Sequence, residues 1–108
     1  MQPPPQADAI ARLRAQWLRE LPARAGLILE ALRAIAPTAS GELARVRARS
    51  LCHQLRGTAG SFGLVVVGEV AGQIEQVLGG SSPCEVTTAR ALADRLDEAL
   101  GRETGPSP

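Results

Sequence analysis

The chain has 108 residues, enough for one small domain with a single hydrophobic core. Its twelve basic residues are all arginine, and eleven acidic residues nearly balance them, which leaves a formal net charge of +1. This balance excludes the strong overall positive charge that draws proteins to nucleic acid or to anionic membranes. Only 2% of the residues are aromatic, whereas alanine and leucine are abundant, so the composition favours helices over strands.

The sequence shows no pattern typical of a membrane span or of a secretory signal. No stretch approaches the roughly 18 apolar residues that a membrane helix needs, and the start, MQPPPQAD, lacks the charged-then-apolar order of a signal peptide. We therefore expect a cytoplasmic protein. Cys52 and Cys84 do not form a CxxC motif and predict two buried or half-buried thiols rather than a disulfide scaffold.

Segments rich in proline, glycine and polar residues mark both ends of the chain. We expect residues 1–6 and 102–108 to be disordered tails and residues 7–101 to form one helical domain. Met1 together with these polar tails favours a free-standing chain over a piece of a larger kinase.

A short first helix is predicted from Asp8 to Leu21, because Asp8 can cap it and apolar residues recur at helical spacing. Pro22 suits the first turn of a second helix, since the N–H that proline lacks would have no partner there. Pro37 ends this second helix. The residues that the two helices are expected to bury are Ile10, Leu13, Trp17, Leu18, Leu21, Ala25, Ile28, Leu29, Leu32, Ile35 and Ala36.

A third helix is predicted to start at a Ser40 cap and to end near Phe62, with Gly63 in the left-handed conformation that stops a helix. A fourth helix follows almost at once. The fifth is expected to start at the capping box Ser82–Glu85, with Pro83 at its first position. The last two helices are expected to bury Val67, Val70, Ala71, Ile74, Val77, Leu78, Val86, Ala89, Leu92, Ala93, Leu96, Ala99 and Leu100.

Short connections favour antiparallel packing of successive helices. The expected fold is therefore all-α: an antiparallel four-helix bundle of the second to fifth helices, with the short first helix as an addition at one end. Because one bundle can bury all of these apolar faces, we expect a monomer.

The only histidine, His53, is predicted to lie on the outer face of the third helix. At 100° per residue it lies about 160° from Leu55, which faces the core. Glycine in a helix interior costs roughly 1 kcal/mol relative to alanine, so glycines beside the histidine need a reason. Missing side chains there would leave the imidazole accessible to a large partner. The residues that share this outer face are Arg49, Arg56, Gly57 and Gly60.

An exposed imidazole with an arginine beside it can act as a nucleophile toward a phosphoryl group. Neutral imidazole is abundant near pH 7, and the Arg56 guanidinium has a geometry that suits phosphate. The other interpretation is an ordinary surface histidine on a helix whose glycines allow tight packing. Residue types alone leave both interpretations open.

The segment LCHQLRGTAGSFGL, continued by VVVGEVAGQIEQ, resembles the signature of the histidine phosphotransfer (HPt) domain family. In that family the phosphoacceptor histidine is followed by x-Leu-Lys-Gly-Ser/Thr, then by Leu-Gly and, one helix on, by an apolar-Glu pair. Arginine at the lysine position keeps the charge, and Phe62 replaces the usual leucine. The matching residues are His53, Leu55, Arg56, Gly57, Thr58, Gly63, Ile74 and Glu75.

This resemblance implies a phosphocarrier without autokinase activity. His53 would shuttle a phosphoryl group to and from receiver-domain aspartates in a two-component phosphorelay, and Arg56 would stabilise its charge. The implied partners are a response-regulator receiver domain or a hybrid histidine kinase. Mg²⁺ is expected on the receiver, so this chain is expected to hold no cofactor or metal. We expect the partner to contact Arg49, Gln54, Gly57, Gly60 and Gln73.

Other functions fit the sequence less well. A non-catalytic module that binds a receiver or another protein through the His53 face is the main alternative. A sensor-kinase dimerisation helix is disfavoured because that family has an acidic residue where Gln54 follows the histidine. A zinc site from Cys52, His53 and Cys84 is disfavoured because adjacent helical residues diverge by about 100°. A stripe of three arginines without interleaved aromatic residues makes nucleic-acid binding the weakest option.

Overall fold

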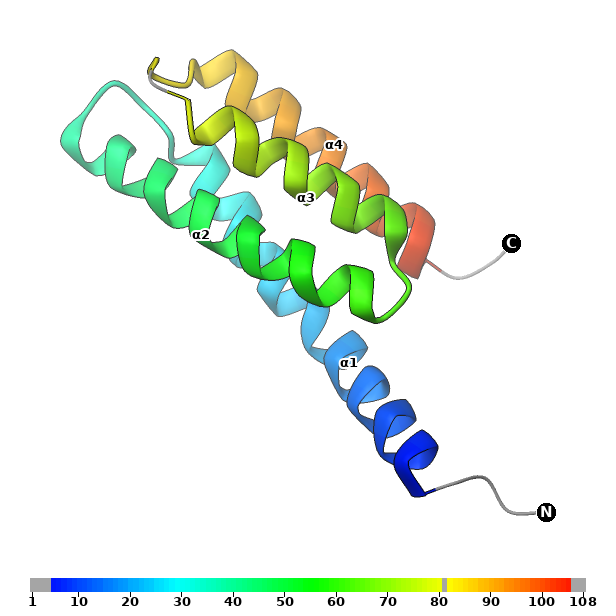
Figure 1. The fold of residues 1–108 in the computed structure, drawn as a ribbon. Helices are drawn as coiled ribbons and strands as arrows, with labels where there is room; N and C mark the ends of the chain where they lie inside the picture. The colour runs from blue at the N-terminus through cyan, green and yellow to red at the C-terminus, as the bar shows by residue number, and fades with distance from the viewer. Residues whose placement is uncertain (1–4, 81, 106–108) are drawn as a thin grey trace.

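The computed structural model describes residues 5–80 and 82–105, and within these ranges the chain forms four α-helices and no strand. Each helix packs against the next one in the chain, and α4 also packs against α1, so the four form a closed antiparallel bundle (Figure 1). The prediction of an all-α bundle is confirmed. The helices are α1 (Pro5–Arg33), α2 (Ala39–Ser61), α3 (Val65–Leu78) and α4 (Val86–Thr104).

The core consists mainly of aliphatic side chains from all four helices, together with Trp17 and Cys52, and no polar or charged residue is buried among the described residues. Burial of these side chains supplies most of the stability of the bundle, at about 25 cal/mol per Å² of apolar surface. None of the four helices is both long and apolar enough to cross a membrane. The largest side chains that are fully buried are Ile28, Leu32, Cys52, Val67, Ile74, Leu78 and Leu96.

The prediction of a separate short N-terminal helix is wrong, because α1 continues through Pro22 as one helix of 29 residues. Trp17, Leu21, Ala25 and Ile28 recur at spacings of four, four and three, and all are buried against the bundle. An unbroken helix keeps these side chains on one face. Pro22 itself is exposed, so the carbonyl that loses its hydrogen bond there can be hydrated.

The first turns of α1 extend beyond the other helices, as the lower part of Figure 1 shows. Ile10 and Leu13 were predicted to be buried, but their exposed fractions are 60% and 58%. The core begins at Trp17, whose ring centroid lies 5.2 Å from that of Phe62. The overhang explains the error, since helical spacing predicts which face is apolar but not where the partner helices end.

The structure places both tails and two helix starts differently from the prediction. Residues 5–6 and 102–104 are helical rather than disordered, and residues 1–4 and 106–108 lie outside the described residues. Thr38, rather than Ser40, caps α2 by accepting the N–H of Gly41 at 3.0 Å. A Cβ at Gly41 would lie 2.1 Å from the carbonyl oxygen of Ala36, so only glycine fits this tight connection.

The predicted start of α4 at the capping box Ser82–Glu85 is also wrong. The helix begins at Val86, its N-cap Glu85 makes no side-chain capping bond, and the residues before it are not helical. Cys84 packs against the core in this non-helical connection, and the backbone of Glu85 is extended. At the end of α2, by contrast, Gly63 has a φ of 84°, which confirms the predicted left-handed stop.

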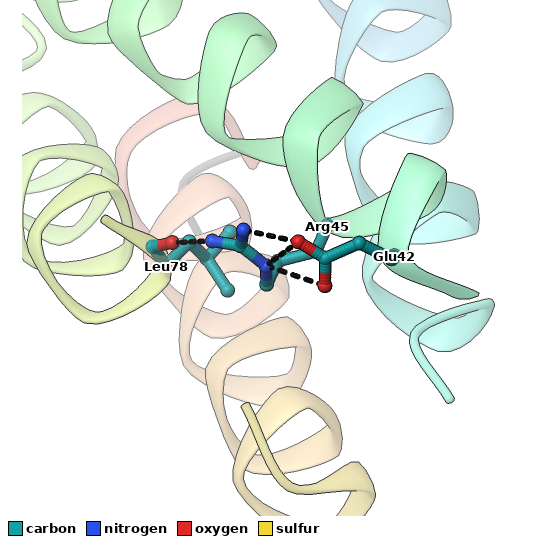
Figure 2. Close-up of polar contacts among 3 residues, drawn as sticks. All are labelled: Glu42, Arg45 and Leu78. Carbon is teal, nitrogen blue, oxygen red and sulfur yellow. Dashed lines mark hydrogen bonds and ion pairs between the residues drawn. The ribbon is translucent and has the colours of Figure 1, made fainter. Parts of the chain in front are cut away.

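Side chains from neighbouring helices bind both ends of α3. At its N-terminus the backbone N–H of Val67 donates to the carboxylate of Glu103 on α4. At its C-terminus the guanidinium of Arg45 on α2 donates to the carbonyl of Leu78 and also to Glu42, as Figure 2 shows. The guanidinium holds the pKa of the Glu42 carboxyl below its ordinary value through these hydrogen bonds. These contacts tie one end of α3 to α4 and the other end to α2, and α3 supplies the functional site with its carboxylate.

Candidate functional site

His53 lies near the middle of α2 and projects away from the core. Its side chain is 63% exposed, whereas Cys52 and Leu55, on either side of it, are buried and hold that face of α2 against the bundle. The imidazole Nδ1 lies 2.7 Å from Oε1 of Glu75 on α3, which is hydrogen-bond distance. The exposed histidine is therefore held in a defined orientation by a neighbouring helix.

This hydrogen bond selects one tautomer of the imidazole. A carboxylate can only accept, so the ring must carry a proton on Nδ1 to donate to Glu75. In the neutral ring the lone pair is then on Nε2. No described residue forms a hydrogen bond with Nε2. The arrangement presents Nε2 of His53 as a free nucleophilic nitrogen on an exposed surface.

Glu75 joins His53 to a second charged residue. Its side chain is only 17% exposed, and its Oε2 lies 3.4 Å from Nη1 of Arg56. That oxygen is buried and has no hydrogen-bond partner, since the contact with Arg56 is an ion pair without hydrogen-bond geometry. One carboxylate thus holds the imidazole through one oxygen and attracts the guanidinium through the other.

Arg56, one turn beyond His53 on α2, reaches this carboxylate with a side chain that is 51% exposed. Its aliphatic stem lies over Gly72 of α3: a Cβ at that glycine would lie 3.0 Å from Cδ of Arg56. The guanidinium is therefore placed near the imidazole while keeping half of its surface in solvent. Such a group can neutralise negative charge that arrives at His53.

The surface on the other side of His53 is open. A Cβ added to Gly57 or to Gly60 would have no atom within 4 Å, so both glycines leave free space on the outer face of α2. Next to Gly57 a groove of about 750 Å³ runs between α1 and α2. Its lining includes His53, Gln54 and Gly57 from α2 and Trp17, Arg24 and Leu27 from α1.

Two of the predicted site residues make their side-chain contacts away from the imidazole. Gln73 on α3 accepts a hydrogen bond from Arg95 of α4, so the structure places it on the side of α3 that faces α4 and not on the His53 face. Arg49 is on α2, but its guanidinium lies at the end of α3, where a Cβ at Gly79 would lie 3.2 Å from its Nε. The structure brings together His53, Gln54, Arg56 and Gly57.

The sequence interpretation missed Glu75 as the partner of His53, although it matched Glu75 to a family motif. The signal was present in α3, where Glu75 lies four residues after Ala71 and seven after Gly68, on a stripe of small residues. A carboxylate on such a stripe faces a closely packed neighbouring helix. Leu27, which is 42% exposed beside the groove, was also missed because it lies outside the buried stripe of α1.

Cys52 lies next to His53 in the sequence but belongs to the core. Burial raises the pKa of its thiol to about 12, and the negative charge of Glu75 adds to this effect. The thiol therefore stays protonated at neutral pH, when it is neither a nucleophile nor a metal ligand. Across the described parts of the chain, no three His, Cys, Asp or Glu residues lie together as a group that could hold a metal ion.

Comparison with models of protein families matches residues 12–102 to the Hpt domain. The matched range starts within α1 and ends within α4, so it includes most of the bundle and all of the His53 site. Comparison with curated proteins and with solved structures finds no match.

Proposed function

Because this chain belongs to the Hpt domain family, whose members carry out phosphotransfer in two-component signalling, we propose that His53 is its phosphoacceptor. The observation that carries the proposal is the hydrogen bond from Nδ1 of His53 to Glu75, at 2.7 Å. It leaves Nε2 as the nucleophile on an exposed surface. The expected partners are receiver domains and histidine kinases, with which Hpt domains interact in phosphorelays.

The proposed transfer is a displacement at phosphorus. The Nε2 lone pair of His53 forms the new N–P bond while the bond between phosphorus and the aspartyl oxygen of the receiver breaks, which regenerates the free aspartate. The imidazole keeps its proton on Nδ1 and acquires positive charge, and the carboxylate of Glu75 stabilises that charge. Transfer in the other direction returns the phosphoryl group to an aspartate by the same steps.

Arg56 is proposed to stabilise the phosphoryl group. Its guanidinium is beside the carboxylate that holds His53, and it is exposed enough to turn toward a phosphate on Nε2. Phosphoryl transfer depends mainly on positioning and charge stabilisation, which a rigid helix surface and one cation can contribute. We expect the receiver to supply Mg²⁺, and this chain to need no cofactor of its own.

The open surface beside His53 is proposed to receive the partner. Gly57 and Gly60 leave room on α2, and the adjacent groove offers apolar side chains such as Leu27. Gln54 lines the same groove. Arg49 is one turn before His53 on α2, and its guanidinium, at the end of α3, would contact the edge of a bound receiver. We further propose that the chain acts as a cytoplasmic monomer that carries phosphate without kinase activity.

The proposal is tested with a receiver domain that carries labelled phosphate on its aspartate. The parent protein is expected to acquire label that is labile in acid and stable in base, and His53→Gln is expected to acquire none. Glutamine keeps a polar side chain at this exposed position, so the variant should remain folded by circular dichroism. If His53→Gln takes up label as well as the parent does, the assignment of His53 is wrong.

The same experiment separates the alternative function. A docking module without phosphotransfer would bind the receiver through the His53 face but would never become labelled. Binding measured by calorimetry, together with the absence of label on the parent, would therefore support the docking module and contradict the phosphocarrier.

A further inference from the structure

Arg56 reaches Glu75 by crossing α3 at a position that has no side chain. A Cβ at Gly72 would lie 3.0 Å from Cδ and 3.7 Å from Cγ of Arg56, and the helix is otherwise open there. Carbon atoms in favourable contact are about 3.5–4.0 Å apart. An alanine at position 72 would therefore push the stem of Arg56 away from α3.

We propose that Gly72 is a positioning residue of the phosphotransfer site, because its missing side chain lets Arg56 lie across α3 with its guanidinium at Glu75. This inference rests on the proposed function of His53 and Arg56. It adds to the site a helix-surface position that contacts neither the phosphoryl group nor the partner directly.

The other reasons for a glycine at this position are absent. Gly72 is inside α3, and Gly63 is the only described glycine with positive φ, so the backbone does not require glycine at residue 72. Close packing of helix backbones is also not the cause, because both atoms that approach the added Cβ belong to the Arg56 side chain. Gly68 differs: its added Cβ would meet backbone atoms of α2 at 3.6 and 3.7 Å.

Glycine at this position carries a cost to the helix. Alanine is the better helix former, and exchanging glycine for alanine in a helix interior normally stabilises a protein. We therefore expect Gly72→Ala to affect stability and the site differently. The helix should become no less stable, whereas Arg56 should lose its contact with Glu75. A purely structural glycine would not show this combination.

The test uses phosphoramidate as a small phosphodonor, so that no receiver is needed. Its P–N bond breaks as Nε2 of His53 bonds to phosphorus, and ammonia leaves. Gly72→Ala is expected to reduce the rate of phosphorylation about fivefold. This factor is the free energy of a half-exposed ion pair converted to a rate at 1.36 kcal/mol per factor of ten. Its urea midpoint should equal or exceed that of the parent. Gly26→Ala is the matched control: Gly26 also lies inside a helix, but its added Cβ meets no atom within 4 Å, so this variant should keep the parental rate.

A double-variant cycle assigns the effect to Arg56. In the Arg56→Ala background, the exchange of Gly72 for alanine should change the rate no further, because the stem that it displaces is gone. If Gly72→Ala keeps the parental rate, or if the two effects multiply in the double variant, the positioning role is wrong.

A crystal structure of Gly72→Ala gives a readout that is independent of activity. The distance between Nη1 of Arg56 and Oε2 of Glu75, 3.4 Å in the parent, is expected to increase beyond ion-pair range. A guanidinium that stays at Glu75 would overturn the inference. If the parent takes phosphate from neither phosphoramidate nor a receiver, the proposed function fails, and this distance alone decides whether Gly72 positions Arg56.

Discussion

His53 and Glu75 are 22 residues apart in the sequence, and a hydrogen bond of 2.7 Å joins their side chains across the interface of α2 and α3. The histidine is mostly exposed, whereas the carboxylate is mostly buried. This asymmetry has a chemical consequence, because the buried partner holds one ring nitrogen and the exposed face leaves the other accessible. A freely rotating surface histidine would lack this orientation.

Removal of the Glu75 carboxylate should release the imidazole. Glu75→Ala is expected to shift the neutral ring of His53 away from the Nδ1–H tautomer, as measured by ¹⁵N NMR. It is also expected to slow phosphorylation by at least about tenfold, since a hydrogen bond to a charged group contributes about 1.5–3 kcal/mol. Glu69→Ala, which removes an exposed carboxylate from the same helix, is the control. An unchanged tautomer ratio in Glu75→Ala would show that this contact does not orient the ring.

A large side chain at position 57 should block phosphotransfer from a receiver domain but not from a small-molecule phosphodonor. Gly57→Gln places a side chain in open space beside His53, and we expect it to slow transfer from a phosphorylated receiver about tenfold or more through misplacement of the partner. Phosphorylation by phosphoramidate should remain at the parental rate. Gly26→Gln, on the groove between α1 and α4, should affect neither reaction. Equal transfer from the receiver to Gly57→Gln and to the parent would place the docking surface elsewhere.

The positions on α2 could be predicted from the sequence, whereas the contact with Glu75 could not. The rotation of 100° per residue is enough to place His53 and Gly57 outward, because it depends on one helix alone. The contact depends on how α3 is placed against α2, which is set by long-range contacts such as that of Arg45 with the carbonyl of Leu78, 33 residues away.

The two errors at helix starts have a related cause. Proline is common at the first position of a helix, and this local preference led to the predicted helix starts at Pro22 and Pro83. In the structure the buried stripe of α1 continues through Pro22, and Cys84 packs against the core in the non-helical connection after Pro83. At both sites the burial of apolar side chains outweighs the local preference.

The buried thiol of Cys52 should make the protein less stable in alkali. Below about pH 9 the thiol is protonated in the folded and the unfolded chain, so pH has no effect through this group. Because the pKa is raised from 9.0 to about 12 in the folded state, the unfolded chain ionises first, and stability is lost as the pH rises between these values. The slope approaches about 1.4 kcal/mol per pH unit.

Urea unfolding of the parent and of Cys52→Ala at several pH values from 8 to 11 measures this effect. The variant starts from a lower stability because it leaves a cavity, but it should lack the thiol-dependent part of the decline. The same pH dependence in both proteins would contradict the assigned burial of the thiol.

Glu103 should stabilise α3 from outside that helix. Leu64, at the N-cap of α3, provides no capping side chain, and the carboxylate of Glu103 accepts the N–H of Val67 in its place. Glu103→Ala is expected to lower the free energy of unfolding by about 1 kcal/mol, as the loss of an N-cap does. Glu98→Ala, which breaks only an exposed pair with Arg102 on the same helix, should change it by less than about 0.5 kcal/mol. Equal losses in urea unfolding would exclude a capping role.

The position of phosphate on the imidazole tests the central claim most directly. Heteronuclear ³¹P and ¹⁵N NMR of the phosphorylated protein reports which ring nitrogen is bonded to phosphorus. We expect a single phosphohistidine at His53 with phosphate on Nε2, and no such signal from His53→Gln. Phosphate on Nδ1, the nitrogen that the structure bonds to Glu75, or on any other residue would contradict it.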